Sequence, residues 1–572
     1  MRLPREAVRL GLGRHLGGPK ANPFLSPGFR ASYSSRSGLL FQRSKEPLTS
    51  PFTQTTTNGT LSWRLVLSLG TFSLFASVVY ANRPAPLRFD ALAPAGNDEL
   101  RASRFHRDLS SAKGPILATR VTPSDLEKDA SVDGISHRNG DDLTTLASID
   151  PERLTQILRK NEQAVVVGGG TGVLRYDTNQ IASNCPIEDD HSEAIIAAPS
   201  QAPGKPSGDW MFWGVYDGHS GWSTSAKLRQ SLISHVYLKL AEAYASTAAP
   251  SDSEIDNAIK AGFVALDNDI VLSNVEKAKK LGTKHDGAQL LAPAISGSCA
   301  LLSFYDTRSK LLRVACTGDC RAVLGRRAGG LKWSATQLSS DQTGENPDEA
   351  ARVTADHPGE KDVVKNGRVL GYEPSRVFGD AVLKWPRELS LSLRQAFYAR
   401  WPQPKIITPP YMTAEPLITT TKIEPEHGDF IVIGSDALWE MLSNEEVIGL
   451  VGRWIDQGRL GIGRQAQRSF WDMLPKFSGS GDGLDSNVVS TTSPNSDPPF
   501  RRPPTRPAQW GITKRSRVPV VQDVNVATHV ARNALGGDDH DLISSLFLLG
   551  GSNARRFRDD LTVTVVFFGN EE

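Results

Sequence analysis

Short apolar runs recur along the chain from residue 210 onward, and each is predicted to be a buried β-strand. The clearest run, 210–216, reads Trp-Met-Phe-Trp-Gly-Val-Tyr, and the others cover 311–317, 430–434 and 561–568. Apolar runs of this length, rich in β-branched and aromatic residues, are typical of strands that are buried on both faces. The pattern therefore predicts a core built from β-sheets.

Acidic residues stand at the ends of these runs. Each run has one at its end or just before its start, and an acidic pair precedes a further short run at 194–198; these residues are Asp217, Asp319, Asp436, Asp559, Glu188 and Asp189. A single such residue is more often part of a turn. Several that converge repel one another unless a cation holds them, and carboxylates select Mg²⁺ or Mn²⁺ over zinc. The pattern predicts a hard-metal carboxylate site.

Helical periodicity separates the strand-like runs. A capping box at Ser251 and Glu254 is followed by apolar residues that share one face of a helix. Residues 226–244 predict a second amphipathic helix, and 151–158 predict a short helix leading into the fold. Such helices bury one face against a sheet, so the chain is expected to combine strands and helices in one α+β domain.

The ordered motifs resemble the metal-dependent Ser/Thr protein phosphatases of the type 2C class. The likeness runs from about residue 172 to 569, and its motifs lie at 184–189, 215–221, 296–300, 317–323, 338–349, 375–380, 434–440 and 558–563. The resemblance implies a four-layer β-sandwich of two antiparallel sheets flanked by helices, which would span residues 146–572. It also implies that the acidic residues gather at one end of the sandwich.

Within this family, the chain is most similar to the mitochondrial pyruvate dehydrogenase phosphatases. Segments 173–180, 378–385 and 409–416 carry this closer similarity. It implies a phosphoprotein substrate, the E1α subunit of the pyruvate dehydrogenase complex, whose dephosphorylation would activate that complex.

The resemblance implies how the acidic residues would share two Mg²⁺ or Mn²⁺ ions. Asp217 would bridge both ions, and the carbonyl of Gly218 would bind one of them. Asp436 and Asp559 would bind the other ion. Glu188 would hold its ion mainly through water.

Three further roles complete the predicted site. Asp189 would support the metal ligand that precedes it, and Asp319, together with Asp436, would hold a weaker third ion. His219 matches the general acid of the family. Water activated by two ions would attack phosphorus in line, and His219 would protonate the departing serine or threonine oxygen, so no phospho-enzyme intermediate is required.

Four positions depart from the family pattern. Asn184 stands where the family often has an Arg that grips the substrate phosphate, although the pyruvate dehydrogenase phosphatases share this Asn. Arg376 is the candidate for a compensating cation, with a surface ion pair as the alternative. Ser220 and Ala437 replace usual glycines, and Asp190 replaces a usual basic residue. No predicted metal ligand is lost, so we expect an active enzyme.

The net charge of +2 conceals a basic N-terminus. Residues 1–45 carry nine Lys or Arg and one acidic residue, a net charge of +8, which leaves −6 for the remainder. A basic, acid-poor start that contains serines predicts a mitochondrial presequence, with a disordered basic tail as the alternative. Residues 62–81 include 17 consecutive uncharged residues and predict an inner-membrane anchor, with a buried or interfacial helix as the alternative.

The remaining segments lack regular periodicity. Residues 82–145 mix Pro, Ala, Ser, Asp and Arg and predict a linker. Two insertions interrupt the family pattern, at 387–408 and at 474–520. The second is rich in Ser, Pro and Gly and then in Arg, and it predicts a surface loop, with a docking segment for a large partner as the alternative.

Charge and cysteine content count against other classes. The chain beyond the leader has no excess of basic residues interleaved with aromatic ones, which argues against nucleic-acid binding. Four cysteines lack the spacing and histidines of a zinc site and predict buried free thiols; they are Cys185, Cys299, Cys316 and Cys320. The sequence thus favours a mitochondrial protein phosphatase. A catalytically silent, membrane-tethered scaffold of the same family and another hard-metal hydrolase, such as a nuclease, are the alternatives.

Overall fold

The computed structural model describes residues 149–167, 171–183, 185–199, 208–247, 249–329, 332–460, 488–491, 499–512 and 518–569. The predicted presequence 1–45, anchor 62–81 and linker 82–145 lie outside these residues, as does Asn184. Within the ranges given above, no helix combines the length and the apolar character needed to cross a membrane.

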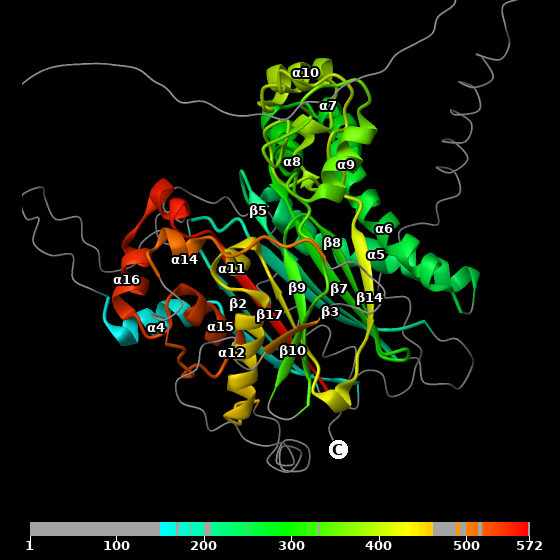
Figure 1. The fold of residues 1–572 in the computed structure, drawn as a ribbon. Coiled ribbons are helices and arrows are strands. Elements are labelled where there is room, and N and C mark those ends of the chain that lie inside the picture. Colours follow the sequence, from blue (N-terminus) through cyan, green and yellow to red (C-terminus); the bar gives the residue numbers. More distant parts are fainter. Residues whose placement is uncertain are drawn as a thin grey trace, which may run out of the picture. The chain divides into compact units, whose positions relative to one another are not determined.

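Two large sheets form the centre of the fold (Figure 1). The seven-stranded sheet has the order β1 (Gln163–Val166), β2 (Val173–Ile181), β17 (Leu561–Phe568), β15 (Phe430–Gly434), β9 (Arg321–Arg327), β10 (Trp333–Gln337) and β16 (Val488–Thr491). The five-stranded sheet has the order β14 (Leu417–Lys422), β8 (Leu311–Thr317), β7 (Ala300–Asp306), β4 (Asp209–Tyr216) and β3 (Asp190–Ala197). Neighbouring strands in both sheets are antiparallel, except that β16 runs parallel to β10.

Two small sheets complete the strands. The three-stranded one has the order β13 (Phe378–Gly379), β6 (Gly297–Ser298) and β5 (Gly218–His219). The two-stranded one pairs β11 (Val364–Lys365) with β12 (Arg368–Val369). Because β5 begins directly after Asp217, the three-stranded sheet fixes the backbone that follows Asp217, as β4 fixes the backbone that precedes it.

Helices cover the outer faces of both large sheets (Figure 1). The seven-stranded sheet shares an apolar core with α4 (Pro151–Arg159), α11 (Asp436–Met441), α12 (Asn444–Asp456), α15 (Val526–Leu535) and α16 (His540–Leu548). The five-stranded sheet shares one with α5 (Ser223–Ser246), α6 (Asp252–Asn268), η2 (Asp269–Ser273), α7 (Asn274–Lys280), α8 (Lys284–Ile295) and α10 (Arg387–Phe397). The other helical segments are α9 (Pro347–Asp356), η3 (Ala381–Leu383), η4 (Pro425–His427), α14 (Arg506–Gln509) and η5 (Gly551–Arg556).

Alternating side chains along β4 show how the layers are held together. Trp210 and Phe212 belong to the core between the five-stranded sheet and its helices. Met211 and Trp213 belong to a separate core between the two sheets. Because successive side chains of a strand point to opposite faces, an apolar run buried on both faces requires a layer on each side. The predicted four-layer α+β sandwich is confirmed.

The predicted capping box also forms. The side chain of Ser251 accepts a hydrogen bond from the backbone N–H of Glu254, and the Glu254 side chain accepts one in return from the backbone N–H of Ser251. The helix that follows this capping box packs one apolar face against the five-stranded sheet. The buried residues of that face are Ile255, Ile259, Phe263, Leu266 and Ile270.

The cysteines follow the prediction at three positions of four. Cys299, Cys316 and Cys320 are buried thiols, whereas Cys185 is exposed. Cys185 lies in the connection between β2 and β3, outside either strand, where its neighbour Pro186 is also exposed. The prediction that all four are buried is therefore wrong for this residue.

His529 makes the stability of the helical layer depend on pH. It is buried in α15, where Nε2 donates to the carbonyl oxygen of Leu450 at 3.0 Å and Nδ1 accepts from Nδ2 of Asn533 at 3.2 Å. Burial lowers the pKa of His529 to about 4, whereas an unfolded chain has a histidine pKa of about 6.5. Protons therefore bind more tightly to the unfolded chain, and stability should fall by roughly 3 kcal/mol between about pH 6.5 and pH 4.

Urea unfolding measured across this pH range checks the prediction. His529→Gln should flatten the pH dependence of the free energy of unfolding, whatever its effect on absolute stability. The exposed His285 supplies the control, since His285→Gln should leave the slope unchanged. A slope that is the same in wild type and His529→Gln would show that His529 does not set it.

Candidate active site

Asp217 and Asp436 meet where the two large sheets end side by side. Asp217 follows β4 of one sheet, and Asp436 begins α11 directly after β15 of the other. The backbone N–H of Asp436 donates to Oδ2 of Asp217 at 3.2 Å. The backbone around Asp217 is held by Cys299, whose N–H donates to the Asp217 carbonyl at 2.8 Å. Gly218 has no room for a side chain, because a Cβ there would overlap the carbonyl oxygen of Glu188.

The predicted carboxylates act on one another electrostatically. Burial, and then the charges of Asp189, Asp559 and Asp319, raise the pKa of Asp217 well above its ordinary value. Burial and the charge of Asp217 do the same for the pKa of Asp436. Carboxylates raise one another's pKa only when they lie close together with too little positive charge between them. The structure thus brings these five acids, distant in sequence, to one edge of the sandwich.

Glu188 and Asp189 lie in the connection between β2 and β3, where hydrogen bonds hold them in place. Oε1 of Glu188 accepts a hydrogen bond from the Gly221 N–H at 2.6 Å, and the Glu188 N–H donates to Oδ2 of Asp560 at 2.8 Å. Asp189 is buried, and its Oδ2 accepts a hydrogen bond from the Thr562 hydroxyl at 2.7 Å. Both acids are therefore anchored to the segment that contains Asp559.

Arg555 joins two of the predicted ligands. Its Nη1 contacts Oε2 of Glu188, and its Nε lies 3.1 Å from Oδ1 of Asp559. Among the described residues, no three His, Cys, Asp or Glu side chains are already arranged to hold one ion. The guanidinium of Arg555 balances part of the negative charge of these two carboxylates. Together with the all-oxygen donor set, this fits Mg²⁺ or Mn²⁺.

His219 is paired with Asp380, a residue that the sequence analysis did not single out. His219 Nε2 lies 2.7 Å from Oδ2 of Asp380, whose own backbone has a left-handed φ of 41° and whose N–H donates to the Ser296 carbonyl at 2.9 Å. Burial lowers the pKa of His219, but the hydrogen bond and charge of Asp380 outweigh it and raise the pKa above its ordinary value. The signal was present in the sequence, since Asp380 also follows an apolar pair and a glycine.

Arg376 makes contacts that favour a structural role. Its Nε and Nη2 donate to Oε1 of Glu349 at 3.0 and 2.7 Å, and its Nη1 donates to the Glu415 carbonyl at 2.8 Å. The side chain is only 7% exposed. Its guanidinium is therefore engaged in a buried ion pair, rather than the surface pair considered as the alternative.

The remaining departures from the family pattern are accommodated locally. Ser220 has a φ of 62°, a left-handed conformation that glycine adopts more easily. Ala437 lies inside α11, so a helical backbone, and not a positive φ, is required there. Asp190 pairs with Arg229, whose Nη1 lies 3.5 Å from Oδ2 of Asp190. The pairing offsets part of the negative charge that Asp190 adds.

Residues 499–512, from the second predicted insertion, lie along the rim of the acidic site. Nη1 of Arg502 is 3.9 Å from Oδ2 of Asp319, the residue predicted to hold a third ion. Nε of Arg506 is 2.6 Å from Oε2 of Glu440, which lies in the same short helix as Asp436. This segment therefore brings two further guanidinium groups to the acids, and the sequence analysis did not foresee it.

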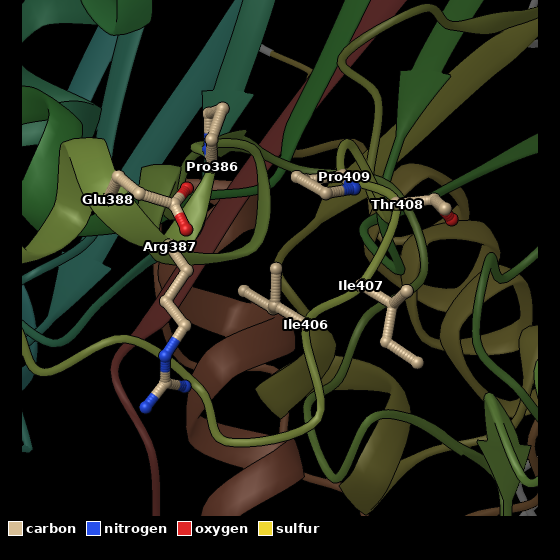
Figure 2. A pocket seen from close by; sticks show the side chains of 7 residues that line it. All are labelled: Pro386, Arg387, Glu388, Ile406, Ile407, Thr408 and Pro409. Atoms are coloured by element: carbon tan, nitrogen blue, oxygen red, sulfur yellow. The ribbon is translucent and has the colours of Figure 1, made fainter.

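A surface pocket lies at the first predicted insertion, 387–408. It has a volume of about 540 Å³ and is lined by Pro386, Arg387, Glu388, Ile406, Ile407, Thr408 and Pro409. Figure 2 shows the start of α10 on one side of it and the 406–409 segment on the other. None of the predicted metal ligands lines this pocket, so it is separate from the acidic site.

Comparison with known proteins agrees with this geometry. The family model for protein phosphatase 2C matches residues 183–469. A protein phosphatase 2C homologue of Schizosaccharomyces pombe is 40% identical over 425 residues, which cover 73% of this chain and 85% of that protein. The mitochondrial pyruvate dehydrogenase (acetyl-transferring) phosphatase 1 of Saccharomyces cerevisiae is 38% identical over 449 residues, 76% of this chain and 75% of that protein. The human mitochondrial pyruvate dehydrogenase phosphatase 2 is 27% identical over 74% of this chain and 84% of its own length.

The family match includes several of the features described above. It spans the end of β4, with Asp217 and His219, and the start of α11, with Asp436. The relatives from Schizosaccharomyces pombe and Saccharomyces cerevisiae match over 73% and 76% of the chain. The sandwich fold and the edge at which these residues meet therefore have a common explanation, which is that the chain belongs to the protein phosphatase 2C family.

Proposed function

We propose that this protein serine/threonine phosphatase depends on Mg²⁺ or Mn²⁺ and dephosphorylates the E1α subunit of the pyruvate dehydrogenase complex in mitochondria. Family membership makes the chain a phosphatase. The observation that carries the metal dependence is the cluster of carboxylates, at the ends of two sheets, that raise one another's pKa. The relatives whose names include mitochondrial pyruvate dehydrogenase phosphatase support the substrate and the compartment.

The metal ligands remain those expected from the sequence. Two ions, with a third as a further expectation, would be held by Asp217, the Gly218 carbonyl, Asp436, Asp559, Glu188, Asp189 and Asp319. Divalent ions bound there would supply Lewis-acid activation of water and would stabilise charge on the phosphoryl group. The neighbouring hydrogen bonds, such as that from Gly221 N–H to Glu188, hold the ligands in place beforehand.

His219 and Asp380 would manage the proton of the leaving group. Asp380 accepts a hydrogen bond from Nε2 of His219 and so orients the ring and favours its protonated form. A protonated imidazole can donate to the departing serine or threonine oxygen as its bond to phosphorus breaks. Asp380 would then act through His219, as a positioning residue.

Targeting stays part of the proposal. The basic segment 1–45 would direct the chain to mitochondria, and 62–81 would anchor it in the inner membrane, on a side that is left open. A catalytically silent scaffold is the second candidate, and only the sequence-based anchor favours it.

Phosphate release from phosphorylated E1α should exceed release from other mitochondrial phosphoproteins. The purified chain should need Mg²⁺ or Mn²⁺, lose activity in EDTA, and regain it when either ion is added in excess. The physical reason is that the acidic site lacks sufficient positive charge of its own to bind a phosphoryl dianion. If no phosphate is released from any substrate with either metal, the catalytically silent scaffold is favoured. Equal rates of phosphate release from all phosphoproteins would contradict the E1α assignment alone.

A further inference from the structure

Arg555 contacts two acids of the site, although it lies outside every motif on which the family resemblance rests. Its guanidinium contacts Glu188 and Asp559, which are 371 positions apart in the sequence and are both predicted metal ligands. Arg555 belongs to η5, the short helical segment that ends three positions before Asp559. This arrangement places one positive charge between two predicted metal ligands.

Both carboxylate oxygens of Glu188 already make a contact. Oε1 accepts the Gly221 N–H at 2.6 Å, and Oε2 contacts Nη1 of Arg555. Each oxygen can still accept a second hydrogen bond, so a water that links Glu188 to a metal ion can bind, but such an ion would lie near the positive charge of Arg555. The backbone N–H of Gly221 is fixed by the fold, whereas the side chain of Arg555 is 33% exposed and can swing toward solvent.

The other guanidinium groups near the site make different contacts. Arg376 pairs with Glu349 and is only 7% exposed, Arg502 faces Asp319 at 3.9 Å, and Arg506 pairs with Glu440 at 2.6 Å. None of these contacts involves Glu188. Arg555 is thus placed to neutralise the ligand pair by itself when no divalent ion is bound.

We propose that Arg555 is a positioning residue of the metal centre that also competes with the ions for it. Without divalent ions, its guanidinium holds Glu188 and Asp559 together; when ions bind, the like charges repel and it gives way. Arg555 therefore sets how tightly Mg²⁺ or Mn²⁺ binds. The inference rests on the proposed metal-dependent function.

Calorimetric titration of the EDTA-treated full-length chain with Mn²⁺ alone tests this proposal. Arg555→Gln removes the charge and should tighten Mn²⁺ binding roughly tenfold, because a competitor for the ligands is lost. Arg555→Lys keeps the charge on a compact ammonium that cannot bridge two carboxylates. The Mn²⁺ affinity of this variant should therefore lie between those of the wild type and Arg555→Gln. The neighbouring exposed residue supplies the matched control, and Arg556→Gln should bind Mn²⁺ as the wild type does.

Thermal unfolding gives a second readout that does not depend on activity. In EDTA, Arg555→Gln should unfold at a lower temperature than wild type, since Glu188 and Asp559 then repel without a counter-charge. In saturating Mn²⁺ the difference should disappear, so the metal-induced rise in melting temperature is larger for the variant. Arg556→Gln should show neither effect.

The outcomes separate this inference from the proposed function. Mn²⁺ affinity that is unchanged or weaker in Arg555→Gln, with wild-type affinity intact, overturns the competition but leaves the metal-dependent phosphatase standing. Wild-type protein that binds no Mn²⁺ overturns the proposed function and this inference together. Should Arg555→Gln fail to fold, as judged by circular dichroism, Arg555→Lys decides, because a Lys variant that binds no more tightly than wild type contradicts the proposal.

Discussion

Asp217→Asn is expected to abolish phosphate release, with kcat lowered by roughly a thousandfold or more at saturating Mg²⁺ or Mn²⁺. The variant keeps the size and hydrogen-bonding shape of the side chain but removes the charge that two ions would share. The backbone N–H of Asp436 can still donate to the remaining carbonyl oxygen, which takes the place of Oδ2. The loss should therefore be one of metal binding and catalysis and not of folding. Phosphopeptide kinetics and Mn²⁺ titration measure it.

The same substitution should stabilise the metal-free protein. Asp217 lies near Asp189, Asp319 and Asp559, whose charges raise its pKa. Removing one charge from this cluster relieves repulsion, and the melting temperature in EDTA should rise by about 2 °C or more. Asp362→Asn is the matched control, since Asp362 is an exposed acid with a φ of 57° that Asn also tolerates. An Asp217→Asn variant as active as the wild type would contradict the proposed metal-dependent mechanism.

His219→Gln is expected to lower kcat on a phosphoserine peptide by roughly 10²- to 10⁴-fold. The amide of Gln can still donate to Asp380, so the fold and the neighbouring metal ligands should be kept. The substituted side chain has no proton that it can give to the departing serine oxygen. The effect should be much smaller on p-nitrophenyl phosphate, because nitrophenolate leaves readily without being protonated.

Comparison of the two substrates makes this test specific to a general acid. A residue that only shapes the site would lower both rates by the same factor, and equal losses would therefore contradict the role of His219. His427→Gln serves as the control, since the side chain of His427 is 55% exposed and pairs with Glu424 away from the acidic site. It should change neither rate.

Local sequence patterns predicted most of the framework. Apolar runs that end in an acid predicted β4 and β15 together with Asp217 and Asp436, and the capping signal at Ser251 predicted the start of α6. These features depend on residues a few positions apart, because strand burial follows a period of two and a helix cap uses its own first turn. The family model and the relatives confirm the fold and the phosphatase assignment that the motifs implied.

The tertiary structure alone decided which charged groups meet. His219 and Asp380 are 161 residues apart, and Arg555 and Glu188 are 367 apart, yet each pair is in contact. Arg376, the candidate cation for the substrate phosphate, contacts Glu349, which lies 27 positions away. No periodicity relates such distant positions, since their contact depends on how two sheets and their connections pack at one edge. The sequence by itself determined the sandwich, its acidic strand ends and the chemistry they favour, whereas packing determined the partners of those acids.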